Sequence, residues 1–211
     1  PLLLAGTDKQ KKIAADILVN GGFGSYALTE PDGGSDAAHP STTAVKVGDE
    51  WVINGRKCFI TNAPLASYFI VFAATDKAAG PAGVTAFLVE REREGVSIGR
   101  HEDKIGIRLS QTSDVIFDNV HVPADHMIGQ EGKGFKLAMS TLNLTRPGGS
   151  SAAVGIMQRC IDECIKYSKE RVVFGKPISK QQAVAFMIAD MEIKTQVARQ
   201  MVHYCARTAQ S

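Results

Sequence analysis

Two short segments in the first third of the chain carry side chains that suit a flat or phosphorylated ligand. The first runs from Tyr26 to Asp36, where a β-rich stretch enters a loop of glycines, hydroxyls and carboxylates. Glycine has no Cβ, so its backbone can approach a ligand closely. An ordinary β-turn loop has the same composition, and this segment alone leaves both interpretations open.

The second segment runs from Lys57 to Asn62. If it is a strand, Phe59 and Thr61 lie on the same face, because strand side chains alternate. An aromatic ring followed by a hydroxyl can lie along a ring system. A half-buried strand without a ligand is the alternative.

A third segment, Arg171 to Pro177, is a basic and aromatic corner between two helical patterns. An arginine there can clamp a diphosphate. The alternative is a cation that compensates the dipole at a helix C-terminus.

Helices and strands must position these segments. Thr7 and Gln10 have the spacing of a capping box, which predicts a helix over about residues 8 to 19. From Gly24 to Val122 the pattern is β-rich, and Gly48-Asp49 and Asn54-Gly55 are typical of tight turns between strands. The predicted strands are Ser25–Leu28, Thr42–Val47, Glu50–Ile53, Lys57–Thr61, Tyr68–Ala74, Val84–Val89, Val96–Ile98 and Ser113–Val122. Many short strands indicate an antiparallel sandwich or barrel, and the lack of strand–helix alternation argues against a Rossmann-type sheet.

Helical periodicity returns after Pro123. Apolar stripes over residues 135–142, 153–165 and 184–205 predict long helices, with Pro147 interrupting or kinking the first of them. Two or three such helices cannot bury their apolar faces alone, so we expect them to need partners.

Composition excludes several classes of protein. The chain has 211 residues, a formal net charge of +2 and no long Lys/Arg tract, which argues against nucleic-acid or membrane-surface binding. No apolar run approaches the ~20 residues of a membrane span. No Cys-x-x-Cys pair occurs; a metal site at Cys160 and Cys164 remains open, but buried thiols of a reducing compartment are favoured and no metal is predicted. The four cysteines are Cys58, Cys160, Cys164 and Cys205.

The order and spacing of these segments resemble the acyl-CoA dehydrogenase family. Tyr26 to Asp36 resembles the family's TEPxxGSD signature, and Lys57 to Asn62 resembles its K-x-[WF]-I-T-N strand. Further matching runs follow in the family's order: Asn119–Pro123, Gly132–Phe135, Thr145-Arg146 and Arg171–Gly175. The resemblance covers essentially the whole chain.

The resemblance implies an α+β fold: an antiparallel β-sandwich or barrel middle domain flanked by helices, followed by part of a C-terminal four-helix bundle. On this alignment residues 1–22 end an N-terminal helical domain, 23–128 form the middle domain, and 129–211 are the first helices of the C-terminal domain. The chain would then be an internal piece of a parent protein that assembles as a homotetramer, a dimer of dimers.

The resemblance also implies an FAD cofactor and an acyl-CoA substrate. The residues expected to line the flavin are Tyr26, Leu28, Thr29, Ser35, Phe59, Ile60 and Thr61. The residues expected to reach the FAD of a neighbouring subunit are Arg171, Phe174 and Gln182. The residues expected to contact the thioester ligand are Ser35, Asn143, Thr145 and Arg146.

Some positions depart from the family pattern. Phe59 replaces a common tryptophan, Val173 stands where Thr or Gln is frequent, and Asn143 stands where Asp is common. Thr145 occupies a position where a minority of the family carries a glutamate base. We therefore assign no catalytic residue within the chain and expect the base beyond Ser211. The loop carboxylates of Glu30, Asp32 and Asp36 are expected to satisfy backbone donors at the turn.

The implied reaction is oxidation of an acyl-CoA to its 2-enoyl-CoA. A carboxylate takes the α proton while the β hydride passes to the flavin, and electrons leave through an electron-transferring flavoprotein. An acyl-CoA oxidase, an enoyl-CoA reductase or a catalytically inactive scaffold fragment remain the alternatives. The expected compartment is the cytoplasm in a bacterium or the mitochondrial matrix in a eukaryote.

Overall fold

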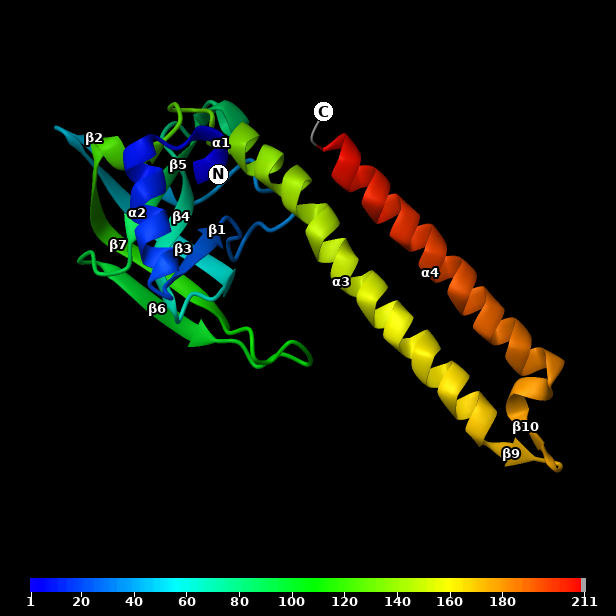
Figure 1. Cartoon of the computed structure of the whole chain (residues 1–211). Coiled ribbons are helices and arrows are strands. Elements are labelled where there is room, and N and C mark those ends of the chain that lie inside the picture. The colour runs from blue at the N-terminus through cyan, green and yellow to red at the C-terminus, as the bar shows by residue number, and fades with distance from the viewer. Residues whose placement is uncertain (210–211) are drawn as a thin grey trace. The chain divides into compact units, whose positions relative to one another are not determined.

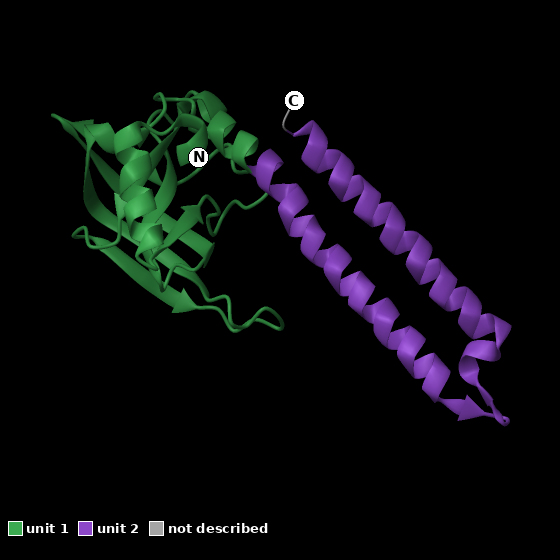
Figure 2. Ribbon diagram, in the orientation of Figure 1, with its two compact units in different colours: residues 1–141 green, residues 142–211 purple. Residues whose placement is uncertain are grey.

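The computed structural model describes residues 1–209. Their contacts divide the chain into two compact units, Pro1–Thr141 and Leu142–Ser211 (Figure 2). The division of the chain into three domains, 1–22, 23–128 and 129–211, stays a prediction.

Unit 1 begins with two helices, α1 (Leu2–Ala5) and α2 (Asp8–Val19). The α2 helix has the predicted bounds. The Thr7 side chain accepts a hydrogen bond from the Gln10 amide, and the Gln10 side chain accepts one from the Thr7 amide. This reciprocal cap satisfies two of the amides that a helix N-terminus leaves without partners.

The centre of unit 1 is an eight-stranded sheet (Figure 1). Its strands pair in the order β6-β7-β3-β2-β4-β5-β8, and β1 pairs with β4. Neighbours are antiparallel except that β1 and one residue pair of β2 run parallel to β4. The strands are β1 (Phe23–Ala27), β2 (Thr43–Val47), β3 (Glu50–Thr61), β4 (Ala66–Ala74), β5 (Val84–Glu90), β6 (Val96–His101), β7 (Thr112–Pro123) and β8 (Met127–Ile128). The α+β class and the largely antiparallel middle region are confirmed.

One predicted hairpin exists and the other does not. Val47 pairs with Glu50, so Gly48-Asp49 is the expected two-residue turn, with Gly48 at φ 58°. The turn at Asn54-Gly55 is wrong, because β3 continues through both residues. Gly55 instead serves close packing: a Cβ there would lie 2.6 Å from the Cα of Thr42.

The two faces of the sheet bury separate cores, since alternate residues of a strand point to opposite sides. On β4, Phe69 and Val71 join one core, whereas Ile70 and Phe72 join the other. Helical residues also enter the second core, namely Leu2, Ala14, Leu137 and Ala138. Short 3₁₀ turns lie at Gly80–Gly83 and Ala124–His126.

Unit 2 is a helical hairpin. The helix α3 (Gly134–Glu170) begins in unit 1, and its residues from Leu142 onward pack against α4 (Gln182–Thr208) (Figure 1). Of the two outcomes predicted at Pro147, the interruption is wrong, because α3 is one continuous helix of 37 residues, and the kink stays a prediction. Pro147 removes a single amide–carbonyl bond, and long helical stretches on both sides sustain the helix through it.

Short elements join the two helices: β9 (Val172–Val173), β10 (Lys176–Pro177) and a 3₁₀ turn at Ile178–Lys180. The hairpin buries few side chains between its helices, among them Val154, Ile161 and Thr195. Many large apolar side chains stay exposed, namely Ile156, Tyr167, Phe186, Met187, Ile193, Val197, Met201 and Tyr204. Two helices alone leave these faces uncovered, as their periodicity indicates. Among residues 1–209, no helix is both long and apolar enough to cross a bilayer.

Candidate functional site

The sheet of unit 1 brings the segment 25–36 against the end of β3. The Ser25 hydroxyl donates a 2.7 Å hydrogen bond to the carbonyl of Thr61. Farther along, the Cys58 amide donates a 2.9 Å hydrogen bond to the carbonyl of Thr29. These two bonds join residues 36 and 29 positions apart in the sequence and so fasten the two segments at both ends of their contact.

The loop after Thr29 is tightly organised. Glu30 and Gly33 exchange backbone hydrogen bonds of 3.1 and 3.2 Å, which makes Pro31-Asp32 the tip of a two-residue turn. The methyl group of Thr29 packs beside Gly34, where an added Cβ would lie 3.6 Å from it. Ser35 follows in an exposed position. Glycine at residue 33 is required by space, because a Cβ would lie 2.9 Å from the Asp36 carbonyl oxygen.

A buried ion pair closes this loop. Glu30 accepts hydrogen bonds from the Lys57 ammonium at 2.7 Å, the Ser41 amide at 2.6 Å, the Ser41 hydroxyl at 2.5 Å and the Thr42 amide at 3.1 Å. Burial acts to raise the pKa of Glu30, but the charge of Lys57 and these hydrogen bonds outweigh burial and lower the pKa to about 2. Four donors around one carboxyl group favour the carboxylate form, which accepts at both oxygens.

A bulge in β3 presents Phe59 to solvent. Lys57 pairs with Val115 and Ile60 pairs with Ser113, so β3 carries one extra residue between these pairs. Phe59 is this extra residue. Its φ of 56° is a left-handed conformation that residues other than glycine rarely adopt. Its side chain is 62% exposed, whereas that of Ile60 is 2% exposed and lies in the core. Thr61 is exposed again.

Tyr26 has a different environment. Its ring lies 5.0 Å from that of Phe72, and its hydroxyl donates a 3.3 Å hydrogen bond to the carbonyl of Ala138 in α3. Burial raises the pKa of this phenol. The Tyr26 hydroxyl is therefore hydrogen-bonded to α3, and any contact of Tyr26 with a ligand would come from its ring or its backbone.

These residues fit a flavin ring chemically. Phe59 offers an exposed aromatic face, and Thr29 and Thr61 offer neutral hydroxyl donors. The edge of the flavin accepts hydrogen bonds and gains negative charge on reduction, so neutral donors suit it. Leu28 is half-buried beside Thr29, and Ile60 can contribute only backbone atoms because its side chain lies in the core. Each assigned role stays a prediction.

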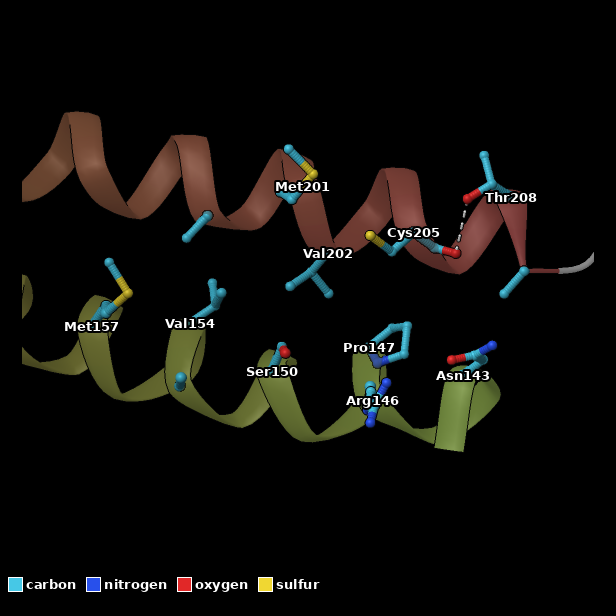
Figure 3. Close-up of a pocket in the computed structure, with 13 residues that line it drawn as sticks. Asn143, Arg146, Pro147, Ser150, Val154, Met157, Met201, Val202, Cys205 and Thr208 are labelled. Carbon is cyan, nitrogen blue, oxygen red and sulfur yellow. Dashed lines mark hydrogen bonds between the residues drawn. The ribbon is translucent and has the colours of Figure 1, made fainter. Parts of the chain in front are cut away.

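In unit 2, a groove of about 620 Å³ lies between α3 and α4 (Figure 3). Asn143 and Arg146 line it from α3, and Met201, Val202 and Cys205 line it from α4. Thr145 is exposed and does not line the groove. Two of the three substrate residues predicted on α3 are thus together, and the third points elsewhere.

The other end of the hairpin carries the remaining predicted residues. Phe174 and Gly175 form the turn between β9 and β10 at φ 53° and 73°, and the phenyl ring is 94% exposed. Arg171 and Gln182, both exposed, begin and end the connection. From Thr145 to Glu170, α3 spans roughly 40 Å at 1.5 Å per residue. Arg171 and Phe174 are therefore separated from Thr145 by almost the whole length of this part of α3.

The sequence did not reveal the Lys57–Glu30 pair or the bond between Ser25 and Thr61. Lys57 stands 27 residues after Glu30, and no local pattern links them. The single clue is a lysine directly before the apolar run Cys58-Phe59-Ile60. Of the loop carboxylates, Glu30 does satisfy backbone donors as expected, whereas Asp36 contacts His39 at 3.1 Å in an exposed position.

Comparison with known proteins agrees with these features. Residues 25–120 match the family model for the acyl-CoA dehydrogenase middle domain, and residues 132–211 match that for the C-terminal domain. The caffeyl-CoA reductase–Etf complex subunit CarC of Acetobacterium woodii is 46% identical over 207 residues, which cover 98% of this chain and 55% of that protein. The short-chain-specific acyl-CoA dehydrogenase of Megasphaera elsdenii is 44% identical over 208 residues, which cover 98% of this chain and 54% of that protein.

The fold agrees as well. The solved structure of butyryl-CoA dehydrogenase from Megasphaera elsdenii superposes with a TM-score of 0.95 at 44% identity, covering 100% of this chain and 55% of that one. The chain spans about half the length of the curated relatives it matches. Two family models, relatives of high identity and a shared fold together place this chain in the acyl-CoA dehydrogenase family.

Proposed function

We propose that the whole protein is an FAD-dependent acyl-CoA dehydrogenase that converts acyl-CoA thioesters to 2-enoyl-CoA. The observation that carries this is the joining of the 25–36 segment to the bulged end of β3, where Thr29 is bonded to Cys58, the neighbour of Phe59, and Ser25 is bonded to Thr61. Family membership supports it, because acyl-CoA dehydrogenases depend on FAD.

When bound, FAD supplies the acceptor for the β hydride of the acyl chain. The chain's own residues orient and tune that acceptor. Phe59 would pack on the flavin ring, and the hydroxyls of Thr29 and Thr61 would donate hydrogen bonds where negative charge develops. Preorganised donors of this kind act without reorganisation at the moment of reaction.

The substrate residues hold the thioester arm. Ser35 lies in the loop beyond Thr29, and Asn143, Thr145 and Arg146 lie on α3. Hydrogen bonds from these groups align the acyl chain, and alignment supplies a large part of the rate enhancement in such sites. We assign the proton-accepting carboxylate to a residue outside these 211, because position 145, where a minority of the family carries a glutamate base, holds a threonine, which has no carboxylate.

The same proposal covers the assembly and the partners of the whole protein. Arg171, Phe174 and Gln182 lie at the far end of the hairpin from Asn143 and Arg146, which supports their contact with the flavin of a neighbouring subunit. The whole protein is then a homo-oligomer, a dimer of dimers. It passes electrons to an electron-transferring flavoprotein, in the bacterial cytoplasm or the mitochondrial matrix.

The test is anaerobic mixing of the flavin-loaded whole protein with acyl-CoA thioesters of several chain lengths. Loss of visible flavin absorbance with formation of 2-enoyl-CoA is the expected result. Oxidation of the pre-reduced protein by a 2-enoyl-CoA in preference to reduction by the saturated thioester would instead indicate a reductase, as the Acetobacterium woodii relative is named. Fast reoxidation by oxygen would indicate an oxidase, and protein without flavin would indicate an inactive scaffold.

A further inference from the structure

Lys57 is the largest side chain that is fully buried in the described part of the chain. Its side chain is 0% exposed and that of its partner Glu30 is 4% exposed. Lysine is almost never buried in this way, because an ammonium ion removed from water loses its hydration. An apolar pair of similar volume often stabilises a core equally well or better. Stability alone therefore does not explain the pair.

Both hydrogen bonds of the Lys57 side chain reach one segment, residues 28–30. Its ammonium donates to the carbonyl of Leu28 at 3.1 Å and to the carboxylate of Glu30 at 2.7 Å. The next amide, that of Cys58, donates to the carbonyl of Thr29 at 2.9 Å. Three consecutive residues of the segment are thus fixed to two consecutive residues of β3.

The Lys57–Glu30 pair also holds the end of the loop at Ser41 and Thr42. The Glu30 carboxylate accepts hydrogen bonds from the amides of Ser41 and Thr42, so both ends of the stretch 31–40 meet at one carboxylate. Directional bonds of this kind set the register of a backbone, which an apolar contact does not. Thr29 lies between the two anchor points and one residue from the bulge that exposes Phe59.

We infer that Lys57 is a positioning residue for the cofactor: through Glu30 and Leu28 it holds Thr29 in register with Phe59 and Thr61. This inference rests on the proposed function, since it concerns the surface proposed to receive the flavin. Lys57 touches no ligand itself and acts through the backbone of residues 28–30.

The test separates positioning from stability. In Lys57→Met the carboxylate of Glu30 is left buried without its cation, so the variant is expected to be destabilised. The double variant Lys57→Met/Glu30→Gln removes both charges and keeps one acceptor oxygen, which can serve the amide of Ser41 or that of Thr42. Its unfolding midpoint is expected to recover toward wild type. Its FAD dissociation constant is expected to stay raised about tenfold, the effect of one well-placed hydrogen bond.

Two further readouts complete the experiment. Without flavin, the Cys58 amide of the double variant is expected to exchange hydrogen about tenfold faster, because its acceptor is no longer held. The matched control is Arg56→Met, which removes the neighbouring cation from its ion pair with Asp114 and is expected to leave both FAD binding and Cys58 exchange unchanged.

The outcomes are distinct. Recovery of FAD affinity together with stability in the double variant, or an equal loss in Arg56→Met, would overturn the positioning role. Unchanged exchange of the Cys58 amide in the flavin-free double variant would also overturn it. Wild-type protein that binds no FAD would refute the proposed function, while the exchange measurement would still decide whether Lys57 fixes the segment.

Discussion

The Ser25 hydroxyl donates a 2.7 Å hydrogen bond to the backbone carbonyl of Thr61, linking the strand before the loop to the end of the strand that carries Phe59. Ser25 is buried, so its replacement leaves a polar carbonyl without this donor. We expect Ser25→Ala to lower the free energy of unfolding by about 1–3 kcal/mol. Chemical denaturation measures this, with the exposed Ser35→Ala as control. Equal, small effects of both variants would show that the bond does not stabilise the fold.

Phe59 and Ile60 are neighbours with opposite environments, and their alanine variants should separate binding from folding. Ile60→Ala removes core contacts and is expected to cost about 2–5 kcal/mol of stability. Phe59→Ala removes an exposed ring and is expected to change stability by less than about 1 kcal/mol. It should nevertheless weaken FAD binding measurably in a spectral titration. Unaltered FAD affinity in Phe59→Ala would contradict the assigned role of the ring.

Local signals in the sequence predicted local structure well. The capping box between Thr7 and Gln10 has the predicted hydrogen bonds, and α2 begins at the predicted residue. This prediction was possible because every group involved lies within one helical turn. The predicted turn at Asn54-Gly55 was wrong because a residue distant in the sequence determines the structure there. The same dipeptide that favours a turn also permits close packing, and the Thr42 backbone beside Gly55 decides between them.

Long-range features of the candidate site were beyond sequence patterns. The bulge at Phe59 depends on how β3 pairs with β7, and the ion pair of Lys57 depends on where residue 30 lies in space. Neither is encoded by neighbours along the chain. The family resemblance supplied the roles of the residues, and the structure supplied the contacts that hold them.

The ion pair predicts acid sensitivity. The pKa of Glu30 is lowered from 4.5 to about 2, so its contribution to stability is complete above pH 4.5 and is lost as the pH falls toward 2. Glu90, whose pKa is also lowered to about 2 against the opposing effect of burial by hydrogen bonds from His126 and Arg93, acts in the same direction. Wild-type protein should therefore lose stability steadily over this window.

The Glu30→Gln variant isolates one of these contributions. Its deficit in unfolding free energy relative to wild type should shrink by about 3 kcal/mol between pH 6 and pH 2, because wild type loses the carboxylate and the variant has none to lose. Denaturant titrations at several pH values measure the difference. A deficit that stays constant with pH would show that folding does not lower the pKa of Glu30.

Thr61 tests the hydroxyl donors. In the flavin-loaded whole protein, Thr61→Val should slow reduction of the flavin by substrate, since loss of such a donor can cost about 3 kcal/mol. Rapid mixing with acyl-CoA measures the rate, and Thr61→Ser serves as the control that keeps the hydroxyl. Equal rates for Thr61→Val and wild type would remove Thr61 from the site.

The assignment of the base outside this chain predicts that residues 1–211 with added FAD show no acyl-CoA dehydrogenation. General-base catalysis typically contributes 10²–10⁴-fold, and an incomplete pocket also loses alignment. Thr145→Glu should not restore turnover in this chain. Dye-coupled assays over a range of acyl-CoA lengths measure it. Robust flavin-dependent turnover would mean that one of the loop carboxylates, such as Asp32 or Asp36, acts as the base.

The most direct test of the account is a crystal structure of the whole protein with FAD bound. The account predicts the flavin ring against the bulged end of β3, with its face on the Phe59 ring. The hydroxyl oxygens of Thr29 and Thr61 should lie within about 2.7–3.2 Å of flavin nitrogen or oxygen atoms. A flavin ring bound elsewhere, for example in the groove between α3 and α4, would contradict it.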